Sequence, residues 1–159
     1  RDAFIEEITK NVNYVICDIP LAIIIAYKRL KKSFPNKKIS TLFDINDEKK
    51  LKKSILDNDI SFIFPHQMSL IKEKFFDLTL AIDCLHEMDR KTVSKYFYDI
   101  NANSEYLYFT IWKSIDLPFS FNKYDFDKND YNIPKNWDQV FKKNSIFPSN
   151  FWNICYKIK

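Results

Sequence analysis

The sequence predicts an α/β fold, a three-layer sandwich whose mostly parallel sheet ends in an antiparallel C-terminal hairpin. Short apolar, β-rich segments alternate with amphipathic helical segments along most of the chain, which is the pattern of β-α-β units. Near the C-terminus, two β-rich segments follow each other without a helix between them, and such neighbours normally pair antiparallel. With 159 residues, 46% of them hydrophobic, the chain is expected to form a single domain over residues 1–159.

The first unit is a helix remnant, a strand and a second helix. Arg1–Lys10 has apolar residues at helical spacing, which indicates part of an amphipathic helix. Tyr14–Cys17 is a short apolar strand that ends at Asp18. Pro20 favours a helix start because proline is tolerated in the first turn, and an aspartate just upstream can accept free amide protons. Leu21–Lys32 is the helix that follows.

Two further strands are expected before the middle of the chain. Ile39–Phe43 is the second strand, and residues 44–47 cap a helix over Glu48–Leu56 that has one apolar and one lysine-rich face. Ile60–Phe64 is the third strand. Met68–Lys74 is expected to be a short connector.

The segment Phe76–Ile82 is a nearly unbroken apolar run. Such a run is typical of a central strand in a parallel sheet, where both faces are buried. Polar residues follow at once: Asp83, His86 and Glu87. Because ligands bind outside the carboxyl ends of the strands in open α/β sheets, these three residues are site candidates.

The remaining segments complete the predicted sheet. Asp89 is a good N-cap for a helix over Arg90–Ile100, and Glu105–Ile111 is a further strand. Ser114–Asn136 is polar and rich in Asn, Asp and Pro, which predicts a long loop or insertion. The C-terminal hairpin is formed by Trp137–Phe141 and Phe151–Ile158.

Composition narrows the classes of partner. The net charge is only +4, so nucleic acid is not expected as a partner. The longest apolar stretch, Ile19–Tyr27, is too short to span a membrane, and a cytoplasmic location is expected. The three cysteines lack the spacing of metal ligands, so no metal is expected.

Four segments carry a resemblance to a known family: Tyr14–Pro20, Phe34-Pro35, Phe62–Gln67 and Phe76–Met88. In order and spacing they resemble class I S-adenosylmethionine-dependent methyltransferases, which have a Rossmann-like fold. More narrowly, the chain is similar to the sugar O-methyltransferases encoded with bacterial surface-polysaccharide genes. The resemblance implies transfer of a methyl group from S-adenosylmethionine to a sugar hydroxyl of a polysaccharide precursor, with a small molecule or glycan as acceptor.

The resemblance also implies a cofactor site. In this class an acid at the end of the second strand binds the ribose hydroxyls, which places Asp18, with Ile19 beside it, at the cofactor. The alternative is that Asp18 only caps the next helix. The end of the third strand corresponds to the adenine pocket, which would be lined by Pro65, His66 and Gln67. For His66 the alternative is an ordinary loop.

For catalysis, His86 is the candidate general base, because a sugar hydroxyl must lose its proton and imidazole titrates near neutrality. Asp83 or Glu87 is its orienting partner or an alternative base, and Asp83 is also assigned to the cofactor site. The structural alternatives are that Glu87 pairs near the following helix and that His86 has no catalytic role.

The chain contains no glycine, although average usage of about 7% would give roughly eleven. Methyltransferases of this class have a glycine-rich loop after their first strand, where the backbone approaches the cofactor. The chain begins with Arg1, so the first strand and this loop are expected to precede it in a longer natural protein.

Two other functions stay open. One is a non-catalytic Rossmann-like module that binds a nucleotide or a partner, which the missing glycine loop favours. The other is a basic surface that binds RNA or a glycan through Lys49–Lys53 and the aromatic residues. For these lysines, the helical period favours a solvated helix face over a phosphate site.

Overall fold

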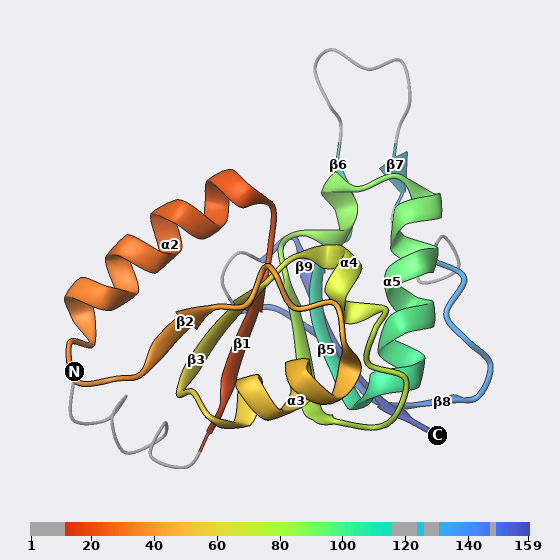
Figure 1. Ribbon diagram of the computed structural model, residues 1–159. Coiled ribbons are helices and arrows are strands. Elements are labelled where there is room, and N and C mark those ends of the chain that lie inside the picture. The colour runs from red at the N-terminus through yellow and green to blue at the C-terminus, as the bar shows by residue number, and fades with distance from the viewer. Residues whose placement is uncertain (1–11, 116–123, 126–130, 147–148) are drawn as a thin grey trace. The chain divides into compact units, whose positions relative to one another are not determined.

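A computed structural model of the chain describes residues 12–115, 124–125, 131–146 and 149–159. The chain divides into two compact units, one ending at Ile71 and the other beginning at Lys72. In both units helices alternate with strands (Figure 1), and each unit contains strands that pair in parallel. The predicted α/β class is therefore confirmed. The predicted amphipathic helix at Arg1–Lys10 lies outside the described residues.

The first unit contains a three-stranded parallel sheet in the order β1-β3-β2. Cys17 pairs with Ile63, so the carboxyl ends of β1 and β3 lie next to each other. The elements of this unit are β1 (Tyr14–Cys17), α2 (Pro20–Ser33), β2 (Ile39–Thr41), α3 (Glu48–Leu56), β3 (Ile60–Ile63) and α4 (Pro65–Met68).

Helix α2 covers one face of this sheet. Its buried Ile23 belongs to one apolar cluster with Ile39, Ile60 and Phe62 of the strands, and its Tyr27 ring meets the Phe62 ring edge-on at 5.8 Å. The connection from β1 to β2 runs across the sheet in one direction, and the connection from β2 back to β3 runs in the other. Because connections between parallel strands are right-handed, α3 is expected on the face opposite α2. With α3 on that face, the unit has the three layers that the sequence predicted.

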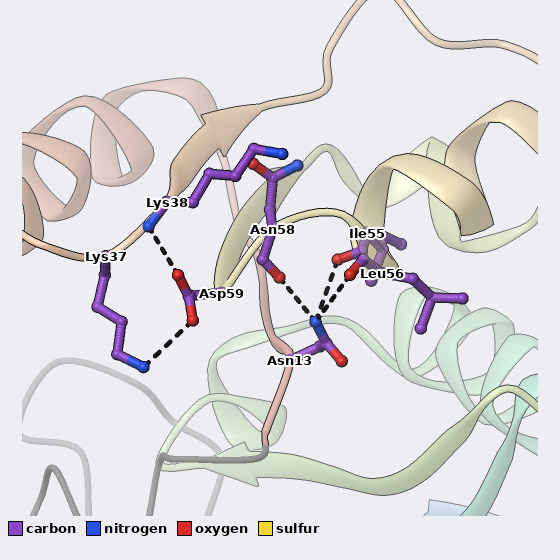
Figure 2. A network of polar contacts seen from close by, with 7 residues as sticks. All are labelled: Asn13, Lys37, Lys38, Ile55, Leu56, Asn58 and Asp59. Atoms are coloured by element: carbon purple, nitrogen blue, oxygen red, sulfur yellow. Dashed lines mark hydrogen bonds and ion pairs between the residues drawn. The ribbon is translucent and has the colours of Figure 1, made fainter.

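A polar network joins the amino ends of the three strands (Figure 2). The side-chain amide of Asn13 donates to the Asn58 carbonyl at 2.7 Å. The Asp59 carboxylate accepts the Lys38 amide at 2.7 Å and the Lys37 ammonium at 3.2 Å. These contacts, led by the Lys38 amide, lower the pKa of Asp59 below its ordinary value. The polar residues at this edge are thus engaged in holding strands together.

The second unit contains a four-stranded sheet in the order β4-β5-β9-β8. Strands β4 and β5 are parallel, while β9 is antiparallel to both β5 and β8, which confirms the predicted hairpin. A separate antiparallel pair joins β6 and β7. The elements of this unit are β4 (Phe76–Ile82), η1 (Leu85–Glu87), α5 (Arg90–Asn103), β5 (Ser104–Trp112), β6 (Ser114–Ile115), β7 (Tyr124–Asp125), β8 (Trp137–Asn144) and β9 (Phe151–Ile158).

Helix α5 connects the two parallel strands and covers one face of this sheet. Its N-cap is Asp89, as predicted, which accepts the backbone amides of Lys91 and Thr92. The buried Phe97 ring lies 6.4 Å from the Phe109 ring and 5.3 Å from the Trp137 ring. The core of this unit therefore lies between α5 and β5, β8 and β9.

The prediction of a central strand with both faces buried is wrong for β4 among the described residues. The strand has the predicted bounds, but it is an edge strand whose described partner is β5. Its side chains alternate between faces, and Leu78, Leu80 and Ile82 are each half exposed, at 50%, 50% and 52%. An apolar run predicts burial of both faces but cannot show whether a second layer covers them.

Other predicted bounds differ by a few residues. Strand β2 ends at Thr41, the helix α5 continues to Asn103, and the short helix α4 begins before the expected connector. The predicted loop at Ser114–Asn136 falls partly outside the described residues, and its described part includes β6 and β7. None of the helices in the described ranges is long and apolar enough to cross a membrane.

Candidate functional site

The second unit makes a sharp turn at Asp83, directly after β4. Asp83 has a left-handed backbone with φ of 54°, a region that aspartate tolerates better than most residues. The Asp83 amide donates to Oγ1 of Thr110 at 2.9 Å. Thr110 lies on β5 opposite Ile82, so the neighbouring strand contacts the turn at its first residue.

His86 lies on the η1 turn that follows and packs against two aromatic rings. Its ring stacks on Trp112 with centroids 3.9 Å apart and an interplanar angle of 27°. The Phe151 ring meets it edge-on at 6.1 Å. The His86 side chain is 0% exposed, while Asp83 is 57% exposed. Nε2 of His86 lies 3.2 Å from Oδ1 of Asp83, so the structure brings these two predicted catalytic residues together.

Burial and charge act on His86 in opposite directions. Burial is the larger influence and lowers the pKa of His86 below its ordinary value, whereas the carboxylates of Asp83 and Glu87 act to raise it. A lowered pKa keeps the imidazole neutral at neutral pH. Chemically, this is a buried proton acceptor with a partly solvated carboxylate beside it. Glu87 is exposed on the same turn.

In the first unit, Asp18 follows β1 and lies on the surface with Ile19, which is 61% exposed. Its Oδ1 accepts the Ile19 amide at 2.7 Å. The N-cap residue of α2 is Ile19, and no side chain caps that helix. The alternative that Asp18 caps α2 is therefore wrong, because its carboxylate bonds one residue before the free amides of the first turn.

The other predicted cofactor residues lie on α4, after the neighbouring strand β3. Gln67 is fully buried, and its amide is bonded to backbone on every side: it donates to the carbonyls of Leu42 and Ile45 at 2.7 and 2.8 Å and accepts the Phe64 amide at 2.8 Å. Both of its donor protons are therefore used. Pro65 is half-buried and His66 is exposed.

The site contains residues that sequence reasoning did not assign. Thr110 and Trp112 lie two residues apart on one face at the carboxyl end of β5. Phe151 is the first residue of β9 and pairs with Trp112. Strand alternation could have identified Thr110 and Trp112 as residues on one face, but only the pairing register places them against Asp83 and His86.

Trp137, Tyr131 and Lys113 also belong to the second unit. Trp137 is buried and donates its indole N–H to Oδ1 of Asn101 at 2.7 Å, so it belongs to the core. Tyr131 is also buried. Lys113 lies just after β5, and its ammonium is 4.9 Å from the centroid of the Trp152 ring.

Comparisons with known proteins give distant structural matches. No family model matches the chain, and no curated protein sequence matches it significantly. A protein from Sulfolobus solfataricus assigned as a type 11 methyltransferase is 18% identical, with 99% of this chain and 91% of that chain covered and a TM-score of 0.48. At this level of similarity, the fold described above rests on the strand pairing of the chain itself.

Two further solved structures are similar to a comparable degree. The pyocyanin biosynthetic protein PhzM is 8% identical over 97% of this chain and 54% of its own, with a TM-score of 0.48. A chain of the Pnkp1/Rnl/Hen1 complex is 11% identical over 100% of this chain and 41% of its own, with a TM-score of 0.46. This chain thus spans about half or less of those two proteins.

Proposed function

We propose that this chain forms part of an S-adenosylmethionine-dependent O-methyltransferase, acting on a sugar hydroxyl of a bacterial surface-polysaccharide precursor in the cytoplasm. The observation that carries the proposal is the Asp83–His86 pair, which directly follows a parallel strand. Outside the carboxyl ends of such strands, α/β proteins bind their ligands. The sequence resemblance in the same segments supports the cofactor and the class of acceptor.

Asp18 is the proposed ribose ligand. Its carboxylate is exposed after β1, and beyond the bond to the Ile19 amide it has further lone pairs that can accept two hydroxyl protons. The exposed Ile19 side chain offers an apolar surface beside it. Pro65 and His66 are proposed to contact the adenine. The engaged amide of Gln67 supports a role in holding α4 and the loop at Leu42 in place.

The glycine-rich loop that such an enzyme needs is not part of this chain, and we place it in a preceding segment together with a first strand. Two observations support an additional strand. Among the described residues, β1 is an edge strand of its sheet, and β4 is an edge strand of its own sheet. Each therefore has one edge at which a further parallel strand can form hydrogen bonds.

His86 is the proposed general base. When bound, S-adenosylmethionine supplies a methyl group already activated on a sulfonium, so the protein needs to orient the acceptor and remove its proton. A neutral imidazole can accept that proton, and the Asp83 carboxylate at 3.2 Å stabilises the resulting imidazolium. Because the ring is closed to solvent, acceptor binding must open one side of it. The exposed Glu87 is the alternative base.

Cofactor binding tests the proposal most directly. S-adenosylmethionine is titrated calorimetrically into this chain and into the longer protein proposed to contain it. We expect binding to the longer protein, and Asp18→Ala should weaken it roughly tenfold or more because charge-assisted hydrogen bonds are lost. The matched control is Asp44→Ala, another exposed acid of the same unit. A well-folded longer protein that binds no S-adenosylmethionine would remove the methyltransferase function.

Replacement of the base tests the mechanism. His86→Ala should lower turnover at saturating cofactor by roughly a hundredfold, because general-base catalysis is lost. Tyr98→Ala, at a side chain 77% exposed on α5, is the control and should leave turnover unchanged. Wild-type turnover in His86→Ala excludes the histidine as base, and Glu87→Gln is then the variant to measure.

A second candidate is a non-catalytic Rossmann-like module that binds a nucleotide or a partner. The closed His86 side chain favours it, since a base that no ligand reaches performs no chemistry. The two candidates differ in one outcome. The module binds its ligand without methyl transfer to any acceptor, and neither His86→Ala nor Glu87→Gln changes its affinity.

A further inference from the structure

The left-handed turn at Asp83 is held by a side chain from another strand. A parallel ladder would continue from Ile82 and Thr110 into the next residues. Instead the ladder ends at Ile82, Asp83 has a left-handed backbone, and the Asp83 amide donates to the Thr110 hydroxyl at 2.9 Å. This bond links β5 to the first residue of the turn. By fixing the Asp83 backbone, it also influences the orientation of the Asp83 side chain.

The same turn connects Asp83 to His86. They are three residues apart, Oδ1 of Asp83 lies 3.2 Å from Nε2 of His86, and the turn begins with the left-handed backbone of Asp83. The imidazole itself stacks on Trp112, which lies two residues beyond Thr110 on β5. One strand thus contacts both members of the pair, through a hydroxyl at one position and an indole at the other.

We propose that Thr110 is a positioning residue for the Asp83–His86 pair, whose hydroxyl holds the Asp83 turn so that the carboxylate faces the imidazole. A role of Thr110 in catalysis rests on the proposed function. The effect of Thr110 on the geometry of the Asp83–His86 pair is independent of that function. Among the described residues, the carboxylates of Asp83 and Glu87 act on the pKa of the imidazole. The rings packed against it from β5 and β9, Trp112 and Phe151, carry no charge.

Proton NMR of the imidazole in the full chain tests the proposal without any activity. The chain has two histidines, so His66→Gln leaves one imidazole to follow. In that background, Thr110→Val removes the hydroxyl but keeps a β-branched shape. We expect the pKa of His86 to fall further in Thr110→Val, since the carboxylate is no longer held beside the ring. Thr110→Ser should restore the wild-type titration.

Two controls separate positioning from general damage to the fold. Thr79→Val removes another strand hydroxyl of the same unit, one that bonds Oγ of Ser104 at 2.7 Å, and should leave the titration of His86 unchanged. The second control is a double-mutant cycle with Asp83→Asn. If Thr110 acts through Asp83, Thr110→Val causes no further shift in that background.

The outcomes are distinct. Equal titration curves for Thr110→Val and Thr110→Ser, or a shift that persists in Asp83→Asn, overturn the proposal. If Thr110→Val fails to fold, Thr110→Ser and Thr110→Cys, which weakens the acceptor, provide the comparison.

In the longer protein, Thr110→Val should lower kcat roughly tenfold to a hundredfold while the KM for S-adenosylmethionine is unchanged. Failure of the longer protein to bind S-adenosylmethionine would end the proposed function but leave the NMR result standing.

Discussion

Asp83 has the left-handed backbone conformation that glycine adopts most readily. The chain has no glycine, and its described left-handed residues are Asp83 and Asn132, at φ of 54° and 45°. Aspartate and asparagine enter this region more readily than other L-residues because their short side chains bond locally. At Asp83 the side chain that tolerates the turn also reaches His86, so one residue serves both backbone and site.

This turn predicts an unusual order of stabilities. Asp83→Ala should be less stable than Asp83→Gly by about 1 kcal/mol, because alanine has a Cβ that clashes in the left-handed region and glycine does not. Both variants lose the carboxylate, so its interaction with His86 cancels in the comparison. Urea unfolding of the two variants measures the difference. An alanine variant more stable than the glycine variant would mean that the turn does not require a positive φ.

At the scale of elements, the short helix α4 depends on one buried side chain. Gln67 joins α4 to the loop after β2 through its bonds to Leu42 and Ile45, and it also accepts the Phe64 amide at the start of α4. Three backbone groups therefore have their hydrogen bonds to this amide. This arrangement explains why a glutamine is fully buried here, because bonds to the backbone replace the hydrogen bonds that its amide would make to water.

Removing that amide should destabilise the protein strongly. We expect Gln67→Leu to lower the free energy of unfolding by about 3 kcal/mol, because buried backbone groups lose their partners. Gln139→Leu is the control: this exposed glutamine on β8 accepts one long bond, from the Tyr156 hydroxyl at 3.4 Å, so the change should be less than about 1 kcal/mol. Urea unfolding of both variants is the measurement. A Gln67→Leu protein of wild-type stability would show that the loop does not depend on this contact.

At the scale of the whole molecule, each of the two compact units carries some of the candidate residues. Asp18 and the α4 residues belong to the unit that ends at Ile71, and the Asp83–His86 pair belongs to the unit that begins at Lys72. Each unit presents its candidate residues after the carboxyl ends of parallel strands. The prediction that residues 1–159 form one domain stays a prediction.

Local sequence patterns determined the elements of this protein. The strands Tyr14–Cys17, Phe76–Ile82 and Phe151–Ile158 and the helix Glu48–Leu56 have the predicted bounds, because apolar period and capping residues such as Asp47 act over a few neighbours. The placement of candidate residues after strand ends followed from the same patterns. The sequence alone also pointed to the helix-free hairpin at the C-terminus.

Only the tertiary structure decided which residues meet. Strand order and register bring Thr110 to Asp83 and Trp112 to His86, and no local pattern encodes contacts between residues 27 and 26 positions apart in the chain. Tertiary packing also closed His86 to solvent, left alternate residues of β4 half exposed, and used the amide of Gln67 within the protein. The physical reason is that burial and hydrogen-bond partners depend on what lies across the sheet, whereas helix and strand formation depend on neighbours along the chain.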